Sequence, residues 1–187
     1  MTKSMTAVYA IVAFVLGALV AFGAQHFLFP QKDQRDAMAT VGAFQGWRLN
    51  CPPRTTKDGI CVLQQALARK GSNQVVAEIN VAPKDTKSLN TDMLTVVAPL
   101  GVFVVPGIKL TIGSGADKTV NYKTCLPAGC VATTPIDAGM ASALSQNTGN
   151  LIVTVMTADG KSVPLNFSLQ GYREALAARA VDMAARK

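Results

Sequence analysis

The sequence contains a single histidine, His26, and it is poor in acidic residues, with 11 Asp and Glu among 187 residues. His26 lies in or at the end of a long apolar segment, so the rest of the chain has no imidazole. That absence excludes Ser–His–Asp and Cys–His catalysis, and histidine-ligated metals, from everything after the segment. The only glutamates are Glu78 and Glu174, which gives no obvious carboxylate pair for glycoside hydrolysis. We therefore expect a protein that is not an enzyme and that holds no cofactor and no metal.

Charge is also absent from the first part of the chain, where no charged residue occurs between Ser4 and Gln31. About 20 apolar residues suffice for a helix to cross a bilayer, and this segment exceeds that length. The sequence predicts a transmembrane signal-anchor helix over residues 1–30, with His26 in an interfacial aromatic belt, followed by a polar tether over 31–43. The alternative is a cleaved signal peptide, whose apolar region would be shorter.

One stripe of the predicted membrane helix consists of small residues. They recur at intervals of three and four, and they are Ala10, Ala13, Gly17, Ala21 and Ala24. Small residues permit close approach of helix backbones within lipid, so the stripe predicts packing against another subunit's helix or against a second copy.

From Phe44 onward, apolar and polar residues alternate with the period of half-buried strands. Examples are Trp47–Cys51, Val75–Val81, Ile108–Ile112, Val120–Thr124 and Leu151–Val155. Asp159-Gly160 predicts a hairpin turn before Val163, Leu165 and Phe167, and Gly113–Asp117 predicts another turn. Uniformly apolar runs at 60–68, 93–98, 102–105 and 130–134 are typical of central strands. The fold is predicted to be mostly β, an antiparallel β-sandwich or partly closed barrel, with Trp47 on the inner face of its first strand.

Two helices are expected beside the strands. One is a short helix within Ile136–Gln146. The other is C-terminal, is capped by Ser168, and closes an edge or end of the β domain. Its apolar face is predicted to contain Leu169, Tyr172, Leu176, Ala180 and Met183.

The formal net charge of +7 favours anionic partners in principle, but the basic residues are spread along the chain without a dense cluster. We therefore expect a solvated basic surface, no nucleic-acid partner and no small-molecule substrate.

The four cysteines are Cys51, Cys61, Cys125 and Cys130. Structural zinc sites usually use cysteine pairs separated by two to four residues, which Cys51 and Cys61 do not form. Each sequence-adjacent pair brackets turn residues, so we expect disulfides 51–61 and 125–130. Disulfides indicate a domain outside the cytoplasm, so with a single membrane span the amino terminus is expected inside the cell.

At these residues the chain resembles the invasion-associated locus B family. The motifs are Phe44-x-x-Trp47-x-x-x-Cys51, Cys61–Gln65, Pro99–Val102, Pro106–Leu110, Tyr122-x-x-Cys125 through Ala132, and Ser168 through Leu176. The resemblance implies that residues 44–187 form a small, disulfide-bonded, mostly β domain of the bacterial envelope with no established enzymatic site. Together with the predicted anchor, it implies a single-pass protein of the bacterial inner membrane whose C-terminal domain lies in the periplasm. The family usually has a cleaved signal peptide, and the long apolar segment here departs from that pattern.

Two classes of function follow. The protein is expected to be a membrane-anchored accessory subunit of an inner-membrane protein complex. The alternative is a periplasmic or secreted binding or adhesion module linked to host-cell invasion.

Overall fold

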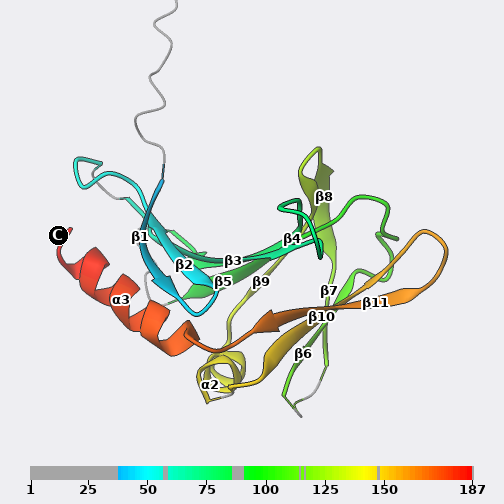
Figure 1. Ribbon diagram of the computed structural model, residues 1–187. Coiled ribbons are helices and arrows are strands. Elements are labelled where there is room, and N and C mark those ends of the chain that lie inside the picture. The colour runs from blue at the N-terminus through cyan, green and yellow to red at the C-terminus, as the bar shows by residue number, and fades with distance from the viewer. Residues whose placement is uncertain are drawn as a thin grey trace, which may run out of the picture. The chain divides into compact units, whose positions relative to one another are not determined.

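The computed structural model of the protein describes residues 38–56, 59–85, 91–113, 115, 117–146 and 148–186. Within these residues the chain folds into two antiparallel β-sheets and two helices that share one hydrophobic core (Figure 1). The predicted membrane helix over 1–30, with its small-residue stripe and His26, lies outside the described residues. No helix in the described part is both long enough and apolar enough to cross a membrane.

The larger sheet has seven strands, and most of them follow one another as a meander. In spatial order they are β1 (Ala39–Phe44), β2 (Trp47–Cys51), β3 (Val62–Ala68), β4 (Val75–Pro83), β5 (Asp92–Ala98), β9 (Gly129–Pro135) and β8 (Tyr122–Leu126). The inward side chains of these strands alternate with polar ones, as the period of two predicts. On the opposite face, polar side chains bond across the strands, as Asn50 does to Gln64 at 2.8 Å and Thr95 to Thr133 at 3.3 Å.

The smaller sheet has four strands, in the order β11 (Ser162–Ser168), β10 (Asn150–Met156), β6 (Ile108–Ile112) and β7 (Lys118–Val120). The β10–β11 hairpin turns at Asp159-Gly160, where Gly160 has a φ of 79°, so this predicted hairpin is confirmed. The predicted turn between β6 and β7 is confirmed as well. Leu110, Leu151, Val153 and Phe167 point inward and complete the core shared with the larger sheet.

The two helices occupy the predicted regions. α2 (Ala138–Gln146) connects β9 to β10, and Asp137 caps it by accepting a hydrogen bond of 2.8 Å from the backbone N–H of Met140. That bond, together with the ammonium group of Lys118, lowers the pKa of Asp137. α3 (Tyr172–Ala184) is the C-terminal helix, and it packs on β1, β2 and β3 (Figure 1).

Trp47 is fully buried at the centre of these contacts, as predicted. Its ring centroid lies 5.0 Å from that of Tyr172, the first residue of α3. Its indole Nε1 donates a hydrogen bond of 2.9 Å to the carbonyl oxygen of Ser168, at the end of β11. One side chain therefore joins the first half of the larger sheet to the end of the smaller sheet and to the C-terminal helix.

The structure corrects three assignments expected from the sequence: where the β domain begins, and two of its strands. β1 occupies Ala39–Phe44, so the β domain begins within the predicted tether over 31–43. Val120 and Tyr122, expected on one strand, lie on β7 and β8 in different sheets, because the chain crosses between the sheets at Asn121. The apolar run at 102–105 is not a strand, and only an isolated bridge pairs Val102 with Thr157.

The buried face of α3 agrees with the prediction except at one position. Leu169 and Tyr172 are buried and Leu176 and Met183 pack against the core, as expected, whereas Ala180 is exposed. Ala175 and Arg179, which were not predicted, are buried as well. The helix begins after Gly171, whose φ of 79° and missing side chain leave no side-chain cap, while the Ser168 hydroxyl accepts a bond of 3.2 Å from the N–H of Gln170. Gly171 is required here because a Cβ would lie 2.3 Å from the carbonyl oxygen of Phe44.

Candidate interaction surface

The loop between β5 and β6 exposes a group of large apolar side chains to solvent. Leu100, Phe103, Val104 and Val105 have relative exposures of 57%, 47%, 51% and 79%. Single exposed apolar residues are ordinary on a protein surface, but four within six positions form a local patch. We call this segment, residues 100–105 with these four exposed side chains, the apolar loop.

The backbone of the apolar loop is fixed to the β10–β11 hairpin by hydrogen bonds at both sides of Val102. The N–H of Phe103 donates to the carbonyl oxygen of Met156 at 2.7 Å, and the N–H of Ala158 donates to that of Gly101 at 3.0 Å. After the loop, Gly107 has a φ of 93°, and a Cβ at this position would lie 2.4 Å from the carbonyl oxygen of Val120. The loop is therefore bonded to the hairpin in its first half and followed by a residue packed closely against Val120, while its side chains face solvent.

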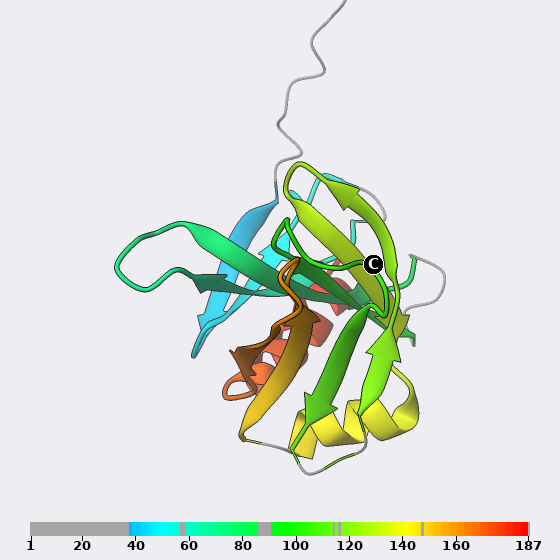
Figure 2. The same cartoon turned by 90° about the vertical axis from the view of Figure 1, so that its right-hand side faces the viewer.

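The tip of the β8–β9 hairpin lies beside the start of this loop. A Cβ at Gly129 would lie 2.3 Å from the carbonyl oxygen of Ala98, two residues before Leu100. Leu126, at the end of β8, is half exposed and adds another apolar side chain to this end of the molecule. The predicted disulfide between Cys125 and Cys130 is present and closes this hairpin. Figure 2 faces the end of the molecule where the hairpin and the loop lie.

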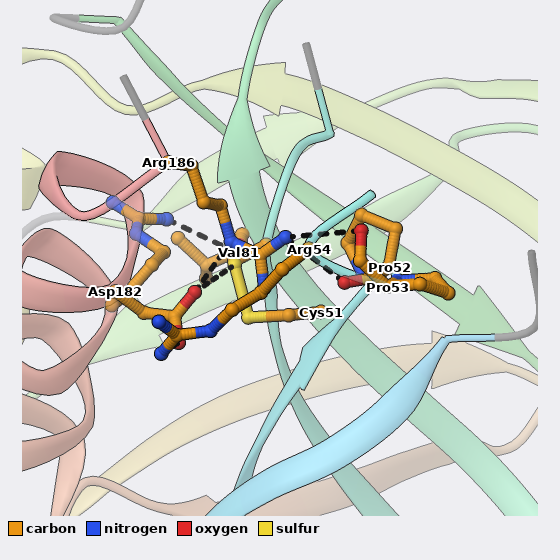
Figure 3. Close-up of a disulfide and its surroundings, with 9 residues drawn as sticks. Cys51, Pro52, Pro53, Arg54, Val81, Asp182 and Arg186 are labelled. Atoms are coloured by element: carbon orange, nitrogen blue, oxygen red, sulfur yellow. Dashed lines mark hydrogen bonds and ion pairs between the residues drawn. A yellow bond between two sulfur atoms is a disulfide. The ribbon is translucent and has the colours of Figure 1, made fainter. Parts of the chain in front are cut away.

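The second predicted disulfide, between Cys51 and Cys61, lies beneath the end of α3 (Figure 3). The Arg186 guanidinium donates a hydrogen bond of 2.9 Å to the carbonyl oxygen of Pro52 and also pairs with Asp182. The other carboxylate oxygen of Asp182 lies 3.4 Å from the guanidinium of Arg54. These contacts fasten the last turn of α3 to the loop that the disulfide closes.

Asp182 and the two sulfur atoms are close enough together to resemble a metal site, since their ligand atoms all lie within 4.8 Å of one another. The sulfur atoms are bonded to each other, so they are not the thiolates that a metal would require. Asp182 is in addition already paired with Arg186 and Arg54. We therefore assign this cluster a structural role.

A third feature is a cleft of about 400 Å³ where three segments meet. It lies between the β1–β2 turn, the end of α2 and the junction of β11 with α3. Its lining is mostly polar and comprises Gln45, Ser145, Gln146, Thr148, Leu169, Gln170, Gly171, Arg173 and Glu174.

Sequence reasoning missed both the apolar loop and the polar cleft. It assigned 102–105 to a central strand because uniform apolarity is the pattern of such strands. The residues that flank the run argue against that assignment. Gly101 precedes it and Pro106-Gly107 follows it, and glycine and proline at such positions are typical of turns and loops. The cleft left no comparable signal, because its residues are scattered over three distant segments.

The model of the invasion associated locus B (IalB) protein family matches residues 47–180 of this chain. An invasion protein B homologue of Brucella abortus (strain 2308) is 29% identical over 137 residues, which cover 71% of this chain and 75% of the relative. A homologue from Brucella abortus biovar 1 (strain 9-941) matches to the same extent.

Among solved structures, the crystal structure of invasion associated protein B from Bartonella henselae matches with a TM-score of 0.66 at 22% identity. The match covers 79% of this chain and 99% of that protein, so the two share the fold of the β domain. The family match begins at Trp47 and spans both disulfides, most of α3 and the apolar loop. The chain belongs to the invasion associated locus B family.

Proposed function

We propose that this protein is a non-enzymatic, membrane-anchored periplasmic interaction protein that acts as an accessory subunit of an inner-membrane protein complex. The observation that carries this proposal is the apolar loop, whose four large side chains face solvent on a backbone that hydrogen bonds fix at Gly101 and Phe103. Fully burying an exposed side chain of this kind contributes about 1.5–3 kcal/mol, and these four are already partly buried, so a partner that covers the loop gains a fraction of that amount from each. A fixed backbone reduces the entropy lost on binding.

The expected location supports the same proposal. The uncharged segment between Ser4 and Gln31 is long enough to hold the chain in a membrane. Two disulfides and no free cysteine in the described residues suit an oxidising compartment such as the periplasm. A tethered domain needs only modest affinity for a partner in the same membrane, because the tether raises its local concentration.

The names of the relatives favour a second candidate function. Both Brucella proteins are described as invasion protein B homologues, and the family is named for invasion. In this second candidate the domain is a periplasmic or secreted binding or adhesion module, and the apolar loop contacts a host or envelope component.

The test uses the full chain, expressed with a small tag in its own bacterium and extracted in mild detergent. We expect the wild-type protein to migrate with a larger complex on native gels. A double substitution, Val104→Asp with Val105→Asp, should release it, because two charges would have to be desolvated in the interface. Val75→Asp is the matched control, since Val75 is equally exposed but lies on β4.

Retention of the double variant in the complex at wild-type amounts would show that the apolar loop is not the docking surface. Recovery of the wild-type chain in the culture medium, shortened at its amino end, would contradict the anchored subunit and support the adhesion module.

A further inference from the structure

The polar cleft lies away from the apolar loop, at the other end of the β10–β11 ladder. Met156, opposite Ser162 in that ladder, bonds to the loop, whereas Ser168 leads into the segment that lines the cleft. The cleft is therefore not part of the proposed docking surface, and what it binds is a separate question.

Its polar side chains have no partners in the described part of the chain. No hydrogen bond or ion pair joins the side chains of Gln45, Gln146, Gln170, Ser145, Arg173 or Glu174 to other described residues. Some exposed lysines elsewhere are paired with nearby acids, as Lys109 is with Asp117 at 2.9 Å and Lys118 with Asp137 at 3.0 Å. Unpaired polar groups from three segments thus converge on one concave surface.

Gln45 lies at a position where glutamine is unfavourable for the backbone. It is the only described residue other than glycine with a positive φ, 46°, and the following Gly46 has a φ of 103°. Asn, Asp or Gly is favoured in such a turn, because longer side chains tolerate the left-handed region poorly. The side chain at this position lines the cleft.

We propose that this cleft binds a neutral N-acetylated amino sugar, as a monosaccharide or as the end of a chain. Side-chain amides both donate and accept hydrogen bonds, as sugar hydroxyls and the acetamido group do, so three glutamines match such a ligand. Arg173 and Glu174 are adjacent and opposite in charge, which favours a ligand without net charge. Leu169 lies in the wall of the cleft beneath these polar groups. The volume of about 400 Å³ is within the range of small-ligand sites.

The experiment measures saturation transfer by NMR from the full-length protein to N,N′-diacetylchitobiose. The protein is kept in a detergent without a sugar headgroup, so that no headgroup competes for the cleft. Maltose serves as a disaccharide with hydroxyls but no acetamido group. We expect transfer to the acetyl methyl protons of diacetylchitobiose and much less to maltose.

Two substitutions separate binding from folding. Gln170→Ala should weaken binding about tenfold, as loss of one hydrogen-bonding partner does. Gln45→Gly should also weaken binding while raising the midpoint of thermal unfolding, because glycine relieves the left-handed backbone. Gln74→Ala, an exposed amide before β4, is the matched control and should bind as the wild type does.

Three results would overturn the proposal. They are no saturation transfer to diacetylchitobiose, equal transfer to maltose, and unchanged binding in both cleft variants.

Discussion

At the residue scale, the pair formed by Trp47 and Tyr172 joins elements that are far apart in the sequence. Trp47 lies on β2 and Tyr172 begins α3, and both side chains are almost fully buried. Gln65, also buried, donates to the same Ser168 carbonyl oxygen as the indole does, at 3.1 Å. The stability of the domain should therefore depend strongly on the indole.

We predict that Trp47→Ala lowers the free energy of unfolding by about 3–5 kcal/mol, as truncation of a large buried aromatic side chain does. Urea unfolding followed by circular dichroism measures this change without relying on tryptophan fluorescence. Trp47→Phe is the control, and it should cost less because it retains much of the ring volume. An unchanged midpoint in the alanine variant would mean that the indole contributes little to the core.

Tyr172 predicts a dependence of stability on alkaline pH. Burial raises the pKa of its phenol from 10.0 to about 12, because the charged phenolate would lose its water. The stabilisation is complete below about pH 10 and is lost as pH rises toward about 12, since the unfolded chain then releases a proton that the folded chain retains. The shift corresponds to about 3 kcal/mol.

Urea unfolding at a series of pH values between about 9 and 12 tests this expectation. Tyr172→Phe should reduce the slope of stability against pH without abolishing it, because burial also raises the pKa of Tyr122 to about 12. Equal slopes in the wild type and the variant would contradict the assignment to Tyr172.

At the element scale, α3 is attached to the larger sheet by a buried arginine as well as by apolar contacts. Arg179 donates to the carboxylate of Asp92 at 2.6 Å and to the carbonyl oxygen of Val81 at 3.3 Å. Asp92 begins β5, and Val81 lies on the neighbouring β4. A long side chain therefore reaches from the helix to two strands beneath it.

We predict that Arg179→Met lowers the free energy of unfolding by about 3 kcal/mol, because it leaves the Asp92 carboxylate partly buried without its partner. Arg173→Met, on the exposed face of the same helix, should change stability by less than about 0.5 kcal/mol. Chemical unfolding measures both variants. If adding Asp92→Leu to Arg179→Met recovers none of the lost stability, the unpaired carboxylate is not the cause.

The same elements show where sequence patterns suffice for prediction and where they do not. Alternation along β2, β4 and β6 identified their buried faces because one face of each strand meets the core. Helical periodicity identified most of the inner face of α3 but missed Arg179, because it treats arginine as exposed and does not anticipate a carboxylate on a distant strand. β1 was missed because Ala39–Phe44 lies at a sheet edge and is mostly exposed, so burial imposes no clear alternation.

At the scale of the whole molecule, the β domain provides the surfaces and the amino-terminal segment is expected to set their location. The predicted stripe of Ala10, Ala13, Gly17, Ala21 and Ala24 would let the membrane helix pack closely against another helix. In the proposed subunit, that packing and the apolar loop act together on partners within one complex.

We predict that Gly17→Leu reduces the amount of partner protein that co-purifies with the full chain, because the larger side chain separates the helix backbones. The substitution keeps the segment apolar, so membrane insertion is retained. Val15→Leu, off the stripe, is the control. Quantitative mass spectrometry after mild-detergent purification measures the partners. If the same amounts of partner proteins co-purify with the wild type and with both variants, the stripe of small residues is not a packing surface.

The contacts of α3 have a consequence for how the chain matures. Trp47 is covered by Tyr172 and bonded to Ser168, and Pro52 is held by Arg186, across separations of 121 and 134 residues for the two hydrogen bonds. A chain is made from its amino end, so β1, β2 and β3 emerge long before the helix that covers them. Until α3 packs on it, that half of the sheet exposes its apolar face and is open to association with other chains. We therefore expect a chain truncated before α3 to leave the apolar face of β1, β2 and β3 uncovered and to associate with other chains.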